Sequence, residues 1–174
     1  GESVSDLIHD EDGDYFEYSA IVDGKITTVK VKDAAGADSL NGLYKNYSTN
    51  NKGYITGVDT YVPFDNTTAD KQAINGKGTN GGEGIDKTSK EYTVTLDTND
   101  EKYVITVDDK AAIYYVDEDG NISESSYKSI SQDDNDRVYA IVEDNLVKFL
   151  VIEEVPTEKD NASGTATVTA AVNG

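Results

Sequence analysis

Acidic residues at alternating positions are the pattern here that could do chemistry most directly, because Ca²⁺ binds carboxylate and other oxygen ligands. One acidic run follows His9 and another precedes Arg137. The candidate calcium ligands in these two runs are Asp10, Asp12, Asp14, Asp133, Asp134 and Asp136. An EF-hand is excluded, because its loop needs Gly at the sixth position and Glu at the twelfth, where this sequence has Tyr15 and Ile21. Two interpretations remain: a loose surface site that binds calcium weakly, or acidic turns exposed to solvent, which we favour.

Side chains capable of catalysis are scarce. The only histidine is His9, in a polar segment near the start of the sequence, whereas a Ser-His-Asp triad needs a buried and oriented imidazole. The absence of Cys excludes a thiolate nucleophile, a disulfide and a cysteine zinc site. The 34 acidic residues offer many carboxylate pairs, but the lack of Trp is atypical of glycosidase clefts. The Gly-rich segment 75–79 lacks the Gly-Lys-Ser/Thr ending of a phosphate-binding loop. The sequence therefore predicts a protein that is not an enzyme, with no cofactor other than weakly bound calcium.

Tyrosine side chains are the candidate contacts for a sugar. The chain has 12 Tyr, and a Tyr ring combines an apolar face, which can stack on a pyranose, with a polar hydroxyl. The candidate glycan-binding residues, which surround one irregular segment, are Tyr44, Tyr47, Tyr54 and Tyr61. The alternative interpretation, which we favour, is that these rings cover sheet edges or fill gaps in the core.

The charge of the chain restricts its partners. With 34 acidic and 15 basic residues among 174, the formal net charge is −19. Such a surface repels nucleic-acid phosphates and anionic lipids. No apolar run approaches the length of a membrane span, and an exported parent protein would carry its signal peptide upstream of this sequence. We expect no nucleic-acid partner and no membrane insertion, and we expect a monomer that contacts neighbouring domains of the same protein.

Strand patterns separated by tight turns dominate the sequence. Segments 15–22 and 25–32 flank Asp23 and Gly24 and predict a hairpin, with a bulge at residues 27–28 where the alternation slips. Five later segments, 91–97, 102–108, 111–117, 137–143 and 146–154, predict five more short strands. The residues that we expect in the core are Ile21, Val22, Ile26, Val29, Val31, Val94, Leu96, Val104, Ile105, Val107, Ile113, Tyr115, Val138, Ile141, Phe149 and Val151.

The predicted fold is all-β, with two small antiparallel lobes, of which the C-terminal one is a five-stranded barrel-like or rolled sheet. The expected divisions are an N-terminal lobe at 1–65, a Gly-rich loop or linker at 66–90, a C-terminal lobe at 91–155, and a boundary segment at 156–174 that includes one further strand or the start of a next module. If the Gly-rich segment instead continues one sheet, the two lobes merge into a single domain.

An internal repeat is visible in the sequence. Residues 20–26 (AIVDGKI) align with residues 140–146 (AIVEDNL), and both copies follow an acidic turn. Duplicated units in tandem would explain this pattern, although β-hairpins can also converge on it.

Three segments together resemble a known group of proteins. They are YSAIVDGKITTVKV at 18–31, GLYKNYSTNNKGYITGVDTYV at 42–62, and IYYVDEDGNISESSYKSISQDDNDRVYAIVEDNLVKFLVIEE at 113–154. Their strand and turn texture resembles the β-rich repeat region of repetitive cell-surface proteins of gut Firmicutes that carry S-layer homology domains. The resemblance covers residues 14–62 and 91–154, and it implies an extracellular location at a Gram-positive cell surface or cell wall and a passive, S-layer-like modular role. No catalytic residue is carried over.

From these observations we expect a non-catalytic structural or spacer module of a bacterial cell-surface protein. The alternative is a β module that binds a glycan or a host protein through exposed Tyr residues.

Overall fold

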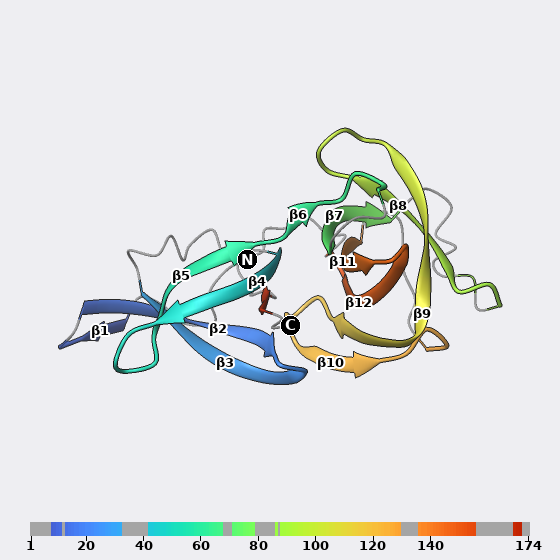
Figure 1. The fold of residues 1–174 in the computed structure, drawn as a ribbon. Helices are drawn as coiled ribbons and strands as arrows, with labels where there is room; N and C mark the ends of the chain where they lie inside the picture. Colours follow the sequence, from blue (N-terminus) through green and yellow to red (C-terminus); the bar gives the residue numbers. More distant parts are fainter. Residues whose placement is uncertain are drawn as a thin grey trace. The chain divides into compact units, whose positions relative to one another are not determined.

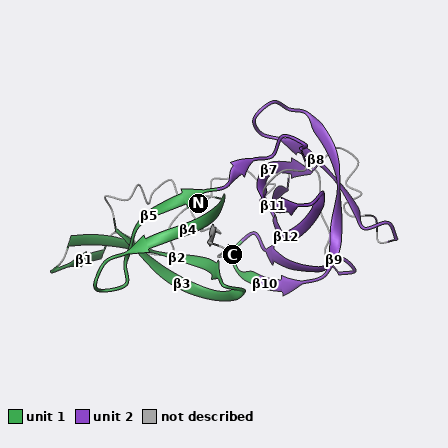
Figure 2. Ribbon diagram, viewed as in Figure 1, with its two compact units in different colours: residues 1–60, 119–122, 157–174 green, residues 61–118, 123–156 purple. Residues whose placement is uncertain are grey.

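The chain folds into β-strands that form two separate sheets (Figure 1). The computed structural model describes residues 8–11, 13–32, 42–67, 71–78, 86, 88–129 and 136–155, and the backbone of 169–171. No helix occurs among these residues, so the all-β prediction is confirmed. Two compact units are present: unit 1 comprises residues 1–60, 119–122 and 157–174, and unit 2 comprises residues 61–118 and 123–156 (Figure 2).

Unit 1 is built from two hairpins and one strand from the far end of the chain. Its strands are β1 (Ile8–Asp10), β2 (Gly13–Val22), β3 (Lys25–Lys32), β4 (Gly42–Thr49), β5 (Ile55–Thr60) and β13 (Thr169–Ala171). The pairings β2–β3, β3–β5, β5–β4, β4–β13 and β13–β2 form a closed cycle, and β1 adds to β2. The strand predicted within the boundary segment is therefore not the start of a next module, because it completes the first sheet.

The β2–β3 hairpin has the predicted turn but not the predicted bulge. Asp23 and Gly24 have φ angles of 51° and 78°, the left-handed pair that a type I′ turn requires. The β2–β3 ladder then runs from Val22↔Lys25 to Tyr15↔Lys32 without a register shift. Without a bulge at 27–28, Ile26 faces away from Val29 and Val31, because side chains alternate between the two faces of a strand. This explains why Ile26, which we expected in the core, is 44% exposed.

The core of unit 1 is small and rich in tyrosine. The buried residues Tyr18, Val31, Tyr44 and Ile55 form its centre. Partly buried side chains pack against them from the same strands, namely Phe16, Val29, Tyr47 and Val58. These residues occupy one face of the sheet, and Tyr15, Lys30 and Lys32 lie on the opposite face of β2 and β3.

Unit 2 contains the predicted five-stranded barrel, but two of its five strands differ from those expected. The strands of this unit's sheet are β6 (Val62–Pro63), β7 (Gln72–Gly78), β8 (Glu91–Leu96), β9 (Lys102–Val116), β10 (Ile122–Ser125), β11 (Arg137–Glu143) and β12 (Leu146–Glu153). The barrel closes through the pairings β7–β8, β8–β9, β9–β12, β12–β11 and β11–β7. β6 and β10 extend it at β7 and β9.

The predicted strands 102–108 and 111–117 are a single long strand, β9. Its partner β12 pairs Val147 with Val107 but Phe149 with Ala112, so extra residues of β9 are accommodated at this point. This irregularity, a large bulge, marks the place where the sequence pattern breaks. The fifth barrel strand is instead β7, which lies inside the segment 66–90 that we predicted to be a loop or linker. That prediction is wrong for residues 72–78.

Gly76 explains how a glycine-rich segment can be a barrel strand. It pairs with Val138 on β11 and with Leu96 on β8. A Cβ atom at Gly76 would lie 2.4 Å from the carbonyl oxygen of Thr95, so β7 approaches β8 in a way that only glycine permits. The glycine thus marks close strand contact here, whereas glycine in a sequence more often signals a loop.

The barrel interior is continuous and apolar. It consists of Ile74, Tyr92, Val94, Leu96, Ile105, Val107, Ile113, Val138, Ala140, Val142, Val147, Leu150 and Ile152. Val104 was also expected there, yet it is 61% exposed, because it alternates with the inward-facing Ile105. Strands β11 and β12 bury apolar side chains on their other face too, including Ile141 and Phe149.

The predicted repeat is not reproduced as aligned. The second hairpin turns at Asp144 and Asn145, with φ angles of 58° and 64°, one residue beyond the position that the alignment with Asp23 and Gly24 implies. A different correspondence exists at the level of topology. In each unit two hairpins pair through their second strands, β3 with β5 and β9 with β12, in parallel. One separate strand, β13 or β7, then joins the two first strands.

The barrel core should dominate the stability of unit 2. Replacing the fully buried Leu150 by Ala is expected to lower the free energy of unfolding by about 2–5 kcal/mol, through lost apolar burial and the cavity left behind. As a control, Val104→Thr should change it by less than about 0.5 kcal/mol, because that side chain is mostly in solvent. Denaturant titration of both variants measures this. Similar losses for the two variants would contradict the inward and outward assignment of β9 and β12.

The close approach at Gly76 makes a second prediction. Gly76→Ala should lower the free energy of unfolding by about 1–3 kcal/mol, because the new methyl group collides with backbone of β8. Gly57 on β5 is the matched control, since a Cβ atom there meets nothing within 4 Å. Gly57→Ala should be neutral or slightly stabilising, because it restricts only the unfolded chain. Equal effects on the two variants in chemical denaturation would show that β7 and β8 are not in close contact.

Candidate functional site

The most organised group of charged and aromatic side chains in unit 1 is a lysine–tyrosine cluster. It comprises Asp10, Tyr15, Lys30, Lys32, Lys52 and Tyr54. The β2–β3 register sets Tyr15 directly opposite Lys32, and Lys30 lies two residues away on the same face. Tyr54 precedes Ile55, which pairs with Val31 on β3. The parallel contact between β3 and β5 therefore brings Tyr54 beside Tyr15.

The two tyrosine rings pack against each other and carry lysine ammonium groups above them. The ring centroids of Tyr15 and Tyr54 are 4.6 Å apart, with 39° between the ring planes. The Nζ atom of Lys30 lies 5.4 Å from the centroid of Tyr15 and 5.5 Å from that of Tyr54, and Lys32 Nζ lies 5.9 Å from Tyr54. These are cation–π distances. Both rings are buried, as expected when lysine stems cover aromatic surface and keep the ammonium group in water.

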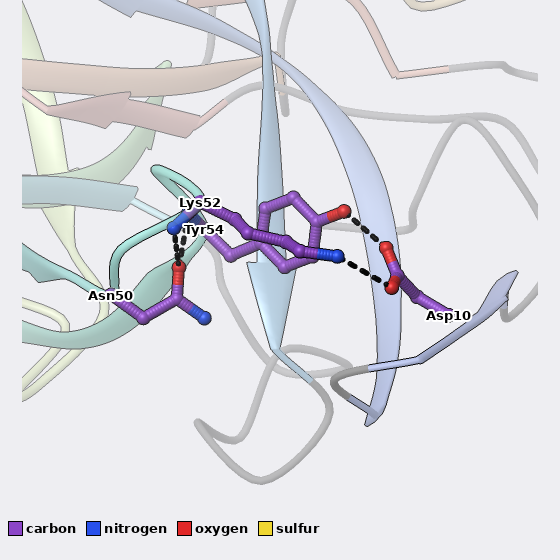
Figure 3. Close-up of polar contacts among 4 residues, drawn as sticks. All are labelled: Asp10, Asn50, Lys52 and Tyr54. Atoms are coloured by element: carbon purple, nitrogen blue, oxygen red, sulfur yellow. Dashed lines mark hydrogen bonds and ion pairs between the residues drawn. The ribbon is translucent and has the colours of Figure 1, made fainter.

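Asp10 connects this cluster to the N-terminal strand. Its Oδ2 atom accepts a 2.5 Å hydrogen bond from the Tyr54 hydroxyl, and its Oδ1 atom lies 3.0 Å from Lys52 Nζ (Figure 3). Asn50 shapes the turn that presents both donors, because its Oδ1 atom accepts hydrogen bonds from the backbone N–H groups of Lys52 and Tyr54, each at 3.0 Å. One carboxylate thereby attaches β1 to the β4–β5 turn.

The hydrogen bond to Asp10 changes the acidity of Tyr54. It raises the pKa of the Tyr54 hydroxyl to about 12, with smaller contributions in the same direction from desolvation and from the negative charge of Asp10. Ionisation of Tyr54 would place a phenolate against a carboxylate and break their shared hydrogen bond. The cluster therefore favours a protonated Tyr54. The contacts of the cluster connect β1 and β2 with the β4–β5 turn.

The predicted calcium ligands are only partly described. Asp10 is engaged by Lys52 and Tyr54, so calcium bound there would have to displace a lysine. Asp14 Oδ1 lies 2.7 Å from His9 Nδ1. Asp136, in unit 2, is buried and accepts a 3.3 Å hydrogen bond from the Val155 N–H. Asp12, Asp133 and Asp134 lie outside the described residues. Within the part of the chain that the structure describes, no three His, Asp or Glu side chains are grouped to hold a metal ion. Calcium binding stays a prediction.

The predicted glycan-binding tyrosines are mostly packed inside the protein. Tyr44, Tyr54 and Tyr61 are buried, and Tyr47 is half-buried against the core of unit 1. Burial of three of the four agrees with the interpretation that we favoured, in which these rings cover sheet edges or fill gaps in the core. Their physical role follows from sheet packing: Tyr44 is a core residue beside Tyr18, and Tyr54 stacks on Tyr15. None of these three offers an open face for a sugar to stack on.

Unit 2 holds a polar network that the sequence analysis missed. Arg137 donates two hydrogen bonds to the carboxylate of Asp97, at 2.9 and 2.5 Å, and lies 5.5 Å from the ring of Tyr139. The Tyr139 hydroxyl donates in turn to Glu153 at 3.2 Å, and burial raises the pKa of that carboxyl. The available signal was that Arg137 is the only arginine in the sequence, because arginine is suited to paired hydrogen bonds with a carboxylate.

Tyr92 is a second feature that the pattern did not reveal. Its ring lies in the barrel core, 1% of the residue is exposed, and its hydroxyl has no hydrogen-bond partner among the described residues. Burial, with a contribution from the charge of Asp136, raises the pKa of this hydroxyl. An unpaired buried hydroxyl costs stability.

The hydrogen bond between Tyr54 and Asp10 predicts how the stability of the protein changes at alkaline pH. The unfolded chain releases the Tyr54 proton near pH 10, whereas the folded chain holds it until about pH 12. The stability that this group contributes should therefore be complete below pH 10 and be lost as the pH rises from 10 to 12. Tyr54→Phe should lower the melting temperature by a few degrees at pH 8, and its difference from the wild type should shrink across that window.

The other tyrosines titrate in both proteins, so the difference between the two isolates Tyr54. Tyr47→Phe is the matched control, because it removes a hydroxyl from the same unit and leaves the Asp10 contact intact. If the difference in melting temperature between the wild type and Tyr54→Phe stays constant from pH 8 to pH 12, Asp10 and Tyr54 are not coupled.

Comparison with known proteins identifies no relative. No protein-family model, no curated protein and no solved structure matches the chain. A search of the described residues found no helix of the length and apolar character needed to cross a membrane. Inferences about the role of the chain consequently rest on its own residues and on how its strands pair.

Proposed function

We propose that this chain is a non-catalytic structural module that acts as a spacer in a bacterial cell-surface protein. The observation that carries the proposal is the parallel pairing of β2 with β13. The chain enters β2 at its amino end, and it leaves β13 at its carboxyl end. Tension on the chain that flanks these strands therefore pulls them in opposite directions along one axis.

This arrangement resists force through the combined strength of its hydrogen bonds. In paired strands that are pulled in shear, all interstrand hydrogen bonds carry the load together. In a hairpin pulled at its open end, the bonds break one after another. β13 pairs in parallel with β4 as well as β2, through three residue pairs on each side. The terminal strand of unit 1 is thus held from both sides in the geometry that opposes extension.

The lysine–tyrosine cluster supports the same role. β1 lies before β2 and pairs with it through only three residues. By itself such a short strand would separate easily under tension. The contacts of Asp10 with Tyr54 and Lys52 add an attachment to the β4–β5 turn. The contacts of Tyr54 with Asp10 and Tyr15 therefore connect strands that are distant in sequence.

The composition is consistent with an extracellular spacer. The chain lacks Cys and carries a net charge of −19, which keeps a crowded surface protein soluble. Its two sheets rely on backbone ladders and apolar cores. A glycan-binding module remains the alternative, but burial of Tyr44, Tyr54 and Tyr61 gives it no specific support.

Force spectroscopy on single molecules tests the proposal. Because the chain has no Cys, handles can be attached through introduced cysteines at any chosen pair of sites. One protein carries Glu11→Cys and a cysteine added after Gly174, which loads β2 and β13 in shear. The comparison protein carries Asn46→Cys and Asp59→Cys, which face each other across β4 and β5 and load that hairpin near its open end. We expect a clearly higher rupture force for the first protein.

A variant separates the contribution of β13 from that of the rest of unit 1. Ala170→Pro removes an N–H group from the centre of β13, where a ladder cannot accommodate proline. It should lower the rupture force between the terminal handles and leave the force across β4 and β5 nearly unchanged. Equal rupture forces in the two pulling directions, or no effect of Ala170→Pro, would overturn the proposed mechanical role.

A further inference from the structure

The position of β13 is a strand-sized slot between the first strands of two hairpins. β2 and β4 do not pair with each other among the described residues, and β13 pairs with both. Ala170 at the centre of β13 lies opposite Ile21 on one side and Leu43 on the other. Without this strand, the backbone groups that now face it on β2 and β4 would lose their partners.

The strand that fills the slot is connected to its own chain by a long segment. Residues 154–168 lie between the end of β12 and the start of β13, a connection that can span up to about 50 Å when extended. The segment is long enough for the strand to be delivered to its own chain or to a neighbouring copy. Every backbone pairing of β13 is the same in the two cases, which is the condition for exchange of an identical element between protomers.

We propose that a second copy of this chain can supply β13 to the slot between β2 and β4, so that copies join by strand exchange. Donation in one direction, repeated from copy to copy, gives an open chain of modules. The competing intramolecular strand has an effective concentration in the millimolar range, set by the length of its connection. Exchange is therefore expected at high local density. The charge of −19 on each copy opposes association at low salt, so added salt should favour it.

The experiment uses introduced cysteines at a residue pair that the register places face to face. Val22 lies opposite Ala171, at a separation in sheets that a disulfide can bridge. Chains with Val22→Cys alone and chains with Ala171→Cys alone are mixed at high concentration, unfolded and refolded together, and oxidised. We expect a disulfide-linked heterodimer on a non-reducing gel, in an amount that increases with protein concentration and with salt. Introducing Ala170→Pro into the Ala171→Cys chain should suppress it.

Two controls make the result decisive. Ala171→Cys mixed with Asp59→Cys, an exposed site on β5 whose pairing partners lie on β4, measures random collisions. The double variant Val22→Cys/Ala171→Cys at low concentration should form its disulfide within one chain, which verifies the register. If that internal disulfide forms and the mixed single variants give no more dimer than the random control, exchange does not occur. If no disulfide forms in any of these proteins, the slot itself is wrongly assigned.

This inference does not depend on the mechanical role proposed above. Rupture force is measured on isolated single molecules, whereas strand exchange is measured as a covalent dimer between molecules. A chain can therefore fail either test and pass the other.

Discussion

Closure of the backbone ladders is the constraint on which the rest of this structure depends. A strand edge left open presents unpaired N–H and C=O groups, and the described part of the chain has no helix with which to cover one. The chain solves this problem in the same way twice. Two hairpins meet through their second strands, and a single strand bridges the first strands, which closes five pairings into a ring. The apolar cores follow from closure, because a ring of strands encloses an interior. Leu150 and Ile152 pack in the core of unit 2, and Tyr18 and Val31 pack in the core of unit 1.

The two bridging strands reveal how the units differ. β7 comes before the hairpins of its unit, pairs with β11 through six residues, and runs antiparallel to β8 and β11, the two strands that it bridges. β13 comes after everything else, pairs through three residues on each side, and runs parallel to both. The closure of unit 1 is therefore the less extensive one. Side-chain contacts among Asp10, Tyr15, Lys52 and Tyr54 supplement it from the outer face of the sheet.

Much of this fold could be predicted from the sequence, because hairpins have local signals. Asp23 and Gly24 correctly predicted a two-residue hairpin turn, and the alternating segments predicted an all-β chain with a five-stranded barrel. The predictions failed where contacts between segments distant in sequence determine the local structure. Gly76 marked close packing between strands, which looks the same in a sequence as a glycine in a loop. The candidate site was harder still. Of the four tyrosines named at 44–61, only Tyr54 belongs to the lysine–tyrosine cluster, because a period-two pattern cannot say which rings a neighbouring strand will cover.

The same physical reasoning links the short bridging strand to the proposed roles of unit 1. A strand that is held on both sides by parallel ladders resists extension, because its hydrogen bonds are loaded together. Yet a strand that contributes three pairs per side, through a connection as long as 154–168, is also an element that a neighbouring copy can replace. Resistance to shear and capacity for exchange are thus not opposing properties. Resistance to shear depends on the direction of pulling relative to the ladder. Capacity for exchange depends on the free energy of the few residue pairs that hold β13, because a neighbouring copy can form the same pairs. In a surface layer, where copies are concentrated and tension acts along the chain, one strand could serve both purposes.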